Sequence, residues 1–234
     1  MLKFLILAFR STLFYLGFYF IVILCAIVGI LLRPFPLLYR LKAMRFGVKS
    51  ILICLKSTCN ITHKIHGLDA LDDQIPSIIL SRHESTWEAL AFHVIFPLHK
   101  DIVKKELKRV PFFGSILTTI ESIIIDRSNK IQSLKILKRA SAKTLKEGLW
   151  VVVFPGGTRV SPGEESIINP GGAILAKQEK SPIYLVKHNA GIVWPKNHFL
   201  KKPGNIDVYI KRLFVEDKDD VKALNYKIKD WIDS

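Results

Sequence analysis

Residues 77–90 read SIILSRHESTWEAL and join a short apolar run to a segment with helical periodicity. The apolar run, Ser77–Leu80, is expected to be a buried strand, and Thr86–Phe96 is expected to be a helix. Ser85 and Glu88 stand three positions apart, the spacing of a capping box, so Ser85 is the expected N-cap. A strand that runs directly into a helix is the building unit of α/β domains.

The same alternation continues from about Asn60 to the C-terminus. Further strands are expected at Thr62–His66, Ser122–Ile125, Leu149–Phe154, Ile183–Lys187 and Ile206–Ile210, and further helices at Ile131–Glu147 and Asp220–Ile232. Gly148 is the expected end of the first of these helices, and Asp219 is the expected N-cap of the second. The pattern predicts an α/β fold, with a mostly parallel mixed sheet flanked by helices.

The N-terminal part of the chain is strongly apolar. Ser11–Leu32 carries no charge, and about 22 residues span about 33 Å as a helix, enough to cross a hydrocarbon core of about 30 Å. A cleaved signal peptide is the alternative, but Arg33-Pro34 follows the segment in place of a small-residue cleavage site. An N-terminal membrane helix is therefore expected.

A second segment, Phe35–Leu55, mixes apolar and basic residues and suits a helix that lies in the membrane interface. The basic residues that follow the apolar stretch outnumber those before it: Arg33, Arg40, Lys42, Arg45 and Lys49 follow it, and Lys3 and Arg10 precede it. By the positive-inside rule, the globular part is expected in the cytoplasm. The expected membrane is a bacterial inner membrane. Because Arg10 borders the apolar stretch, both segments could instead dip into one leaflet. Residues 1–58 are the expected anchor and 59–234 the expected domain.

Composition narrows the classes of partner. Of the 234 residues, 49% are hydrophobic and 24% charged, which argues against disorder, and the net charge of +15 indicates an anionic partner. With an apolar N-terminus and no nucleic-acid-binding signature, membrane lipids are the expected partner and nucleic acid is not. Cys25, Cys54 and Cys59 form no CxxC pair, and no metal site is expected.

His83 and Glu88 could form a base and its orienting carboxylate. Two residues five apart on a regular helix lie about 140° from each other and do not face one another. If Ser85 caps the helix, His83 lies outside it and can fold back over the first turn. Glu88 could then accept a hydrogen bond from one imidazole nitrogen while the other nitrogen faces a substrate. The alternative is that Glu88 only caps the helix.

Three further segments place polar residues at the ends of expected strands. Asp126-Arg127 directly follows the strand residues Ile124-Ile125. Lys104-Lys105, earlier in the chain, is another charged pair. Phe154-Pro155-Gly156-Gly157-Thr158-Arg159 is a glycine-rich turn that ends in arginine, a combination suited to an anion. His188-Asn189-Ala190-Gly191 forms another turn. The remaining histidines are given no role; they are His63, His66, His93, His99 and His198.

In this order, these blocks resemble the lysophosphatidic acid acyltransferase family (1-acyl-sn-glycerol-3-phosphate acyltransferases), from about Ile61 to Phe214. The family's first block is a histidine, four residues and usually an aspartate; here His83 and Glu88 form an HX4E variant. Ile125-Asp126-Arg127 matches the second block. The third block normally reads FPEGTR, and Gly156 stands where the glutamate is usual. The fourth block matches Val186–Gly191, with Leu185 where proline is common.

The resemblance implies an enzyme of phospholipid biosynthesis. It would move a fatty acyl group from acyl-CoA or acyl carrier protein to the 2-hydroxyl of lysophosphatidic acid, without a cofactor or metal. His83 would be the general base and Glu88 its partner. The expected phosphate-binding residues are Arg159, Arg127, Lys105 and Thr158, and main-chain N–H groups near Gly156 and Gly157 or in the 83–86 turn could stabilise the oxyanion.

Other functions stay open. Gly156 removes a charge near the anion site, which leaves room for a different lysolipid acceptor. A thioester hydrolase would use water and need no phosphate clamp, so the presence of Arg159 argues against it. A non-catalytic lipid-binding protein is the third alternative, and His83 with Glu88 argues against it.

Overall fold

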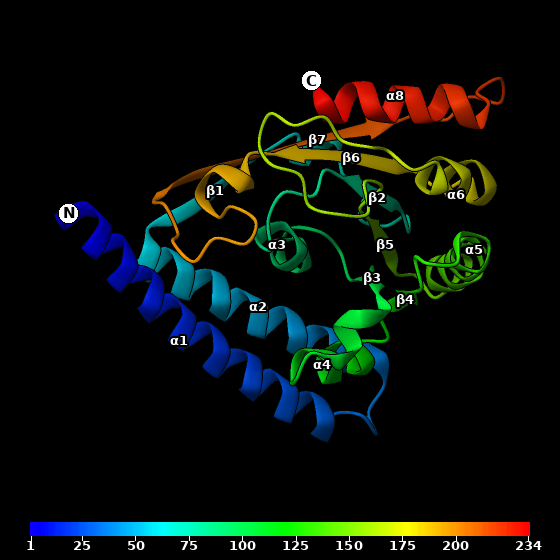
Figure 1. Ribbon diagram of the computed structural model, residues 1–234. Coiled ribbons are helices and arrows are strands. Elements are labelled where there is room, and N and C mark those ends of the chain that lie inside the picture. The colour runs from blue at the N-terminus through cyan, green and yellow to red at the C-terminus, as the bar shows by residue number, and fades with distance from the viewer.

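The fold is a seven-stranded sheet with helices on both faces (Figure 1), seen in a computed structural model that describes residues 1–234 and every side chain except that of Lys130. The strand order is β1-β7-β6-β2-β5-β3-β4, and only the β6–β7 pair is antiparallel. The strands are β1 Ile61–His66, β2 Ile78–Ser81, β3 His99–Lys104, β4 Ile123–Ile125, β5 Trp150–Val153, β6 Ile183–His188 and β7 Gly204–Leu213. The expected mostly parallel mixed sheet is confirmed.

Eight α-helices accompany the sheet. They are α1 Leu2–Leu31, α2 Leu37–Cys59, α3 Trp87–Ile95, α4 Phe113–Thr119, α5 Lys130–Lys146, α6 Gly171–Glu179, α7 Ala190–Val193 and α8 Val221–Asp233, with 3₁₀ turns η1 Leu68–Ala70 and η2 Lys105–Arg109. Alternate strand residues bury to opposite faces, because side chains alternate along a strand. Ile79 and Val152 pack in the core with α2 and α3, whereas Leu80 and Val151 pack in the core with α5, α6 and α8.

The strands and helices expected from about Asn60 onward are all present, with ends shifted by at most three residues. Strand β3 and helices α4, α6 and α7 were not predicted. Gly148 ends α5 as expected, with a φ of +78° that suits glycine. The N-cap of α8 is Asp220, whose side chain accepts from the N–H of Ala223 (2.7 Å), and not Asp219. Asp219 instead forms an ion pair with Lys227.

Helix α3 also begins one residue later than expected. Thr86 is its N-cap, and not Ser85. The hydrogen bonds of the capping box nevertheless form around Ser85: its Oγ accepts from the N–H of Trp87 (3.1 Å), and Oε1 of Glu88 accepts from its N–H (2.7 Å). The box therefore fixes the turn that precedes the helix.

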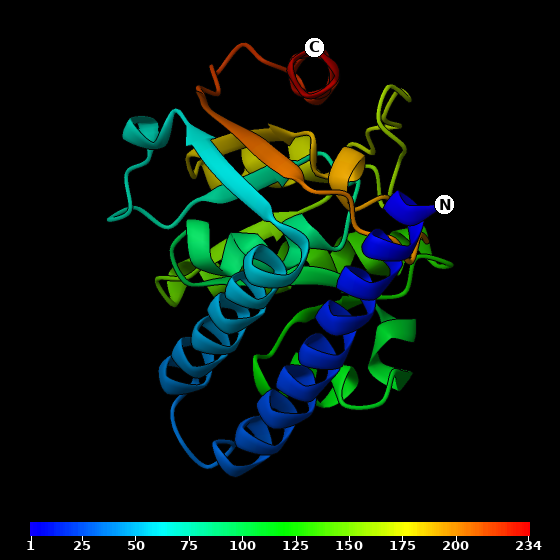
Figure 2. The same cartoon turned by 90° about the vertical axis from the view of Figure 1, so that its left-hand side faces the viewer.

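Helices α1 and α2 form an antiparallel pair on one side of the sheet (Figure 2). α1 is packed onto the α/β part of the chain along much of its length. Arg10 Nε donates to the carbonyl of Thr58 (2.6 Å), and Ser11 Oγ accepts from the N–H of Lys201 (2.9 Å). The Phe14 ring is fully buried and packs edge-on against Trp194. The expected division at residue 58 is thus crossed by a shared core.

Helix α2 packs against both α1 and α3, and the sequence interpretation of its arginines was wrong. Arg40 donates to the carbonyl of Thr119 and pairs with Glu121, and Arg45 donates to the carbonyls of His93 and Phe96. These guanidinium groups therefore satisfy main-chain carbonyls at the ends of α3 and α4 rather than lipid head groups. The Lys42 and Lys49 side chains are exposed.

The outer face of the α1–α2 pair is apolar and exposed. α1 is the one helix among the described residues that is long and apolar enough to cross a membrane, by length and composition alone. Its exposed residues include Phe9, Leu16, Phe20, Leu24 and Leu31, and Phe46 and Ile53 of α2 extend the same kind of surface. An exposed apolar surface of this extent indicates membrane association.

Candidate active site

The centre of the candidate site is the His83–Glu88 pair, at the carboxyl end of β2. His83 lies outside α3, and its Nδ1 is 2.7 Å from Oε1 of Glu88. The same oxygen accepts from the N–H groups of Glu84 (2.8 Å) and Ser85 (2.7 Å). The expected geometry is therefore confirmed: the Glu88 carboxylate binds Nδ1 of His83 and leaves Nε2 as the nitrogen available to a ligand.

Glu88 is fully buried and remains a carboxylate. Burial would raise its pKa, but the charge of His188, the hydrogen bond and charge of His83, and the N–H of Ser85 together hold the pKa of Glu88 below its ordinary value. His188 Nε2 lies 3.9 Å from Glu88 Oε2 and is 3.1 Å from the carbonyl oxygen of Arg82. His188 thus belongs to the buried support of the pair.

The glycine-rich turn after β5 is attached to this pair. The Phe154 ring stacks on the His83 ring, with 4.3 Å between centroids, and the N–H of Val160 donates to the carbonyl of His83 (2.8 Å). Arg159 Nη1 donates to Oγ1 of Thr86 (3.1 Å). The turn and the start of α3 therefore hold the Arg159 guanidinium at Thr86, three residues after His83.

These groups open into one cavity of about 350 Å³. Its polar lining includes side chains that the sequence singled out together with two lysines; they are His83, Thr86, Lys104, Arg127, Thr158, Arg159 and Lys196. Its apolar lining includes residues of four helices, Phe18, Met44, Val48, Leu90, Ile116, Leu117 and Ile120. The cavity therefore offers a base, cationic groups and apolar surface in one space.

The structure brings Arg127, Thr158 and Arg159 together, but not Lys105. Lys105 lies in η2, forms an ion pair with Asp126, and is not among the residues that line the cavity. Lys105 is therefore not placed at the cavity in this arrangement, whereas its neighbour Lys104 lines it. Lys196 was missed entirely: its Nζ donates to the carbonyl of Arg159 (2.8 Å). No local motif marks it, because the contact spans 37 residues.

Most main-chain N–H groups near the His83–Glu88 pair already donate hydrogen bonds within the protein. The N–H of Gly157 donates to the carbonyl of Phe154 (2.9 Å), and those of Glu84 and Ser85 donate to Glu88. These three groups stabilise the turns and are not oxyanion donors in this arrangement, which corrects the expectation for Gly157. Gly156 remains the expected donor from the glycine-rich turn.

Gly157→Ala should disturb the site, and Gly156→Ala should not. Gly157 has a φ of +71°, and an added Cβ would lie 3.1 Å from Nη1 of Arg127. A left-handed alanine costs roughly 1–2 kcal/mol, and Arg127 must also move. At Gly156 a Cβ meets only an ordinary contact, 3.4 Å from the carbonyl oxygen of Ile167. We expect a lower melting temperature and activity for Gly157→Ala alone; equal behaviour of the two variants would contradict this geometry.

Comparison with known proteins decides the family. The model of the Acyltransferase family matches residues 62–189, more than half of the chain. The chain belongs to this family. It is 36% identical to a 1-acyl-sn-glycerol-3-phosphate acyltransferase of Pseudomonas aeruginosa over 175 residues, 74% of this chain and 68% of that protein. It is 30% identical to the Saccharomyces cerevisiae protein of the same name over 164 residues, 66% of this chain and 54% of that protein.

A solved structure shows the same fold. The crystal structure of the 1-acyl-sn-glycerophosphate (LPA) acyltransferase PlsC from Thermotoga maritima matches with a TM-score of 0.74, over 96% of this chain and 95% of that one. The two sequences are 19% identical, so this likeness concerns the fold. Because the match covers nearly the whole chain, it includes the α1–α2 pair as well as the sheet. The family resemblance inferred from the four sequence blocks is therefore confirmed.

Proposed function

We propose that this acyltransferase moves a fatty acyl group from a thioester, on acyl-CoA or acyl carrier protein, to the 2-hydroxyl of lysophosphatidic acid, and so forms phosphatidic acid. One observation carries the proposal: the His83–Glu88 pair opens into a cavity that two arginines and many apolar side chains also line. A lysophosphatidate has the matching parts, a hydroxyl between a phosphate and an acyl chain. The names of the Pseudomonas and yeast relatives support the same acceptor.

The proposed chemistry needs no enzyme nucleophile. Nε2 of His83 takes the proton of the acceptor hydroxyl as its oxygen attacks the thioester carbonyl carbon. The tetrahedral intermediate then expels the thiolate, which takes the proton back from His83, and an ester and a thiol are released. Glu88 keeps the imidazole in the tautomer that carries its proton on Nδ1, and stabilises the imidazolium that forms between the two steps.

Arg159, Arg127 and Lys196 are the proposed cationic groups for the acceptor phosphate. Arg159 and Arg127 approach the cavity from the glycine-rich turn and from the segment after β4, so two planar forks can engage one phosphate. Thr158 is exposed and lines the same cavity, and its hydroxyl can donate a hydrogen bond to the phosphate. Gly156 makes a different lysolipid acceptor the second candidate, since the carboxylate usual at that position is missing.

An acceptor panel tests the proposal. Purified protein in lipid vesicles is given labelled acyl-CoA or acyl carrier protein, with lysophosphatidate, lysophosphatidylcholine, lysophosphatidylethanolamine or no acceptor. We expect phosphatidic acid as the main product, formed only when lysophosphatidate is present. Faster acylation of another lysolipid would establish the second candidate, and acyl release in the absence of any acceptor would establish a hydrolase.

We infer that the α1–α2 pair lies in one leaflet, with the α/β part on the cytoplasmic face of a bacterial inner membrane. α1 contacts the rest of the protein near both of its ends: Ser11 Oγ accepts from the N–H of Lys201 (2.9 Å), and a Cβ added at Gly29 would lie 3.3 Å from the Thr119 side chain. A helix that crossed the bilayer on its own could not keep both contacts. The exposed Lys42 and Lys49 follow α1 and fit the cytoplasmic side by the positive-inside rule.

Charged substitutions on the exposed face of α1 should weaken attachment. We expect the full-length protein to stay with membranes after a high-salt wash, because salt does not screen apolar contacts. Leu16→Asp with Phe20→Asp should move a large fraction of the protein into the wash, since both side chains are about two-thirds exposed at 65% and 68%. Ile131→Asp with Tyr226→Asp, on α5 and α8 of the other side, is the matched control and should stay bound. Release of the unmodified protein by salt alone would refute the apolar attachment.

A further inference from the structure

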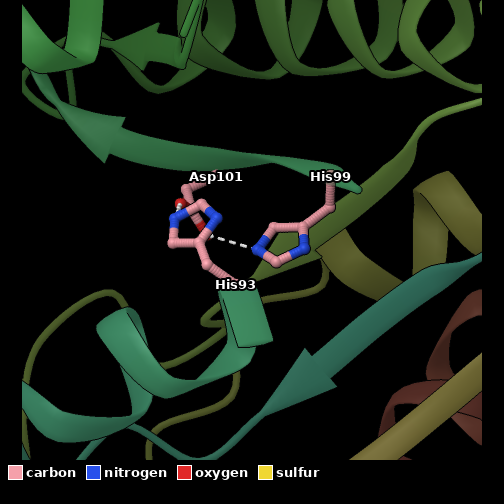
Figure 3. A group of neighbouring side chains, drawn as sticks. All are labelled: His93, His99 and Asp101. Atoms are coloured by element: carbon pink, nitrogen blue, oxygen red, sulfur yellow. Dashed lines mark ion pairs between the residues drawn. The ribbon is translucent and has the colours of Figure 1, made fainter. Parts of the chain in front are cut away.

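A second cluster of titratable side chains consists of His93, His99 and Asp101 (Figure 3). His93 comes from the last turn of α3, and His99 and Asp101 stand two residues apart on β3, so they share a face of the strand. His93 Nε2 is 2.8 Å from Oδ2 of Asp101, and His99 Nε2 is 3.6 Å from Oδ1. The two imidazole rings stack with 4.4 Å between their centroids.

The cluster is buried, and two of its atoms have no hydrogen-bond partner. His99 is 1% exposed and Asp101 is 7% exposed. Nε2 of His99 and Oδ1 of Asp101, which face each other, are both buried and unpaired among the side chains that the structure describes. A buried polar atom without a partner costs roughly 1–3 kcal/mol when it is left so. A partner that binds both Nε2 of His99 and Oδ1 of Asp101 would remove this cost.

The tautomer of His99 indicates the kind of group that would bind both atoms. Nδ1 of His99 lies 2.9 Å from the carbonyl oxygen of Pro97, and because a carbonyl only accepts, Nδ1 carries the proton. In the neutral ring of that tautomer, Nε2 carries a lone pair that is aimed at a carboxylate oxygen of Asp101, 3.6 Å away. Two acceptors that face each other are stabilised by a cation.

We propose that His93, His99 and Asp101 bind one divalent transition-metal ion of the zinc class. Their candidate ligand atoms all lie within 4.8 Å of one another, so small side-chain movements bring them to one ion. Two imidazoles and a carboxylate suit zinc and its neighbours, whereas magnesium and calcium prefer oxygen ligands alone. The Pro97 carbonyl orients His99 in the way that outer hydrogen bonds orient metal-binding histidines.

The location of the cluster connects it to the active site. His93 and Asp101 line the catalytic cavity, and His99 lies behind them. Two of the three proposed ligands therefore lie in the same cavity lining as His83, and an ion can reach them from the cavity. A site with three protein ligands and one open position can take water or an oxygen of a bound substrate.

Titration of the full-length protein tests the site. The protein is purified in detergent, treated with a chelator, and titrated calorimetrically with zinc alone and with magnesium alone. We expect about one saturable zinc site per chain and no comparable site for magnesium. X-ray absorption of the zinc-loaded protein should show two imidazoles and an oxygen donor in the first coordination shell. Absence of saturable zinc binding, magnesium binding of equal affinity, or a shell without two imidazoles would each overturn the proposal.

Substitutions then assign the site to these residues. His99→Gln and Asp101→Asn, which preserve approximate size, should each weaken zinc binding by at least about tenfold. The matched control is His66→Gln, because His66 forms a partly exposed pair with Asp207 (2.9 Å) on β1 and β7, and neither residue lines the cavity. It should bind zinc as the unmodified protein does. Circular dichroism checks folding, and unchanged zinc affinity in a folded Asp101→Asn variant would contradict the assignment.

Discussion

His83→Ala should lower turnover by roughly 10²–10⁴-fold, the usual loss when a general base is removed. The reason lies in the orientation of the ring. Glu88 holds Nδ1 at 2.7 Å, and Phe154 stacks on the imidazole face, so Nε2 is fixed toward the cavity. Alanine removes the proton acceptor while leaving the carboxylate and its main-chain bonds in place. Steady-state acylation of lysophosphatidate measures the effect.

Variants of Glu88 distinguish its role in orienting the His83 ring from the effect of its negative charge. Glu88→Gln should also lower turnover strongly, because the amide cannot stabilise the imidazolium, whereas Glu88→Asp should keep much of the activity. Glu88 is fully buried and accepts two main-chain N–H groups, so its variants are also compared by thermal unfolding. A folded His83→Ala protein with undiminished turnover would refute the mechanism.

The sequence predicted the centre of the site because its determinants are local. The apolar run of β2, the capping-box residues and the five-residue spacing of His83 and Glu88 all lie within one βα unit. A strand that ends where a capped helix begins leaves little freedom for the residues between them. The hydrogen bond between His83 and Glu88 follows from that restriction.

The parts that sequence reasoning missed depend on distant partners. Strand β3, His99–Lys104, contains His99, Lys100 and Asp101, which read as polar and exposed, yet all three are buried. His93 pairs with Asp101, and Glu121 and Glu147 pair with Lys100, so burial is offset by partners on other elements. Neither hydrophobic period nor composition carries that information.

The arginines of α2 illustrate the same limit. Basic residues on an amphipathic helix beside an apolar segment are typical of contacts with lipid head groups. In the structure Arg40 and Arg45 turn inward and bind carbonyls at the ends of α4 and α3. The competing requirement, that the last carbonyls of those helices find donors, arises only once the helices are packed together.

Arg159→Ala should reduce kcat/KM for lysophosphatidate by roughly 30-fold or more, since removing one partner of a desolvated charge pair costs about 2–5 kcal/mol. Thr86 and the turn set the direction of the guanidinium, and its charge has no carboxylate partner among the described side chains. Lysine at position 159 should restore only part of the loss, because it supplies the charge without the planar fork. Lys105→Ala is the matched control: that lysine pairs with Asp126 away from the cavity lining and should matter little.

The acceptor dependence distinguishes phosphate binding from a structural role of the turn. If Arg159 engages the phosphate, the loss should be much smaller with an acceptor that lacks a phosphate monoester. If Arg159→Ala lowers activity equally with every acceptor, or with none, the turn only supports His83 through Phe154 and Val160. Gly156 sharpens this comparison. A Cβ at that position meets only ordinary contacts, so Gly156→Glu can be made there to restore the family's usual carboxylate. Because position 156 belongs to the same turn as Arg159, a change in the preferred acceptor in this variant would show that the turn selects the head group.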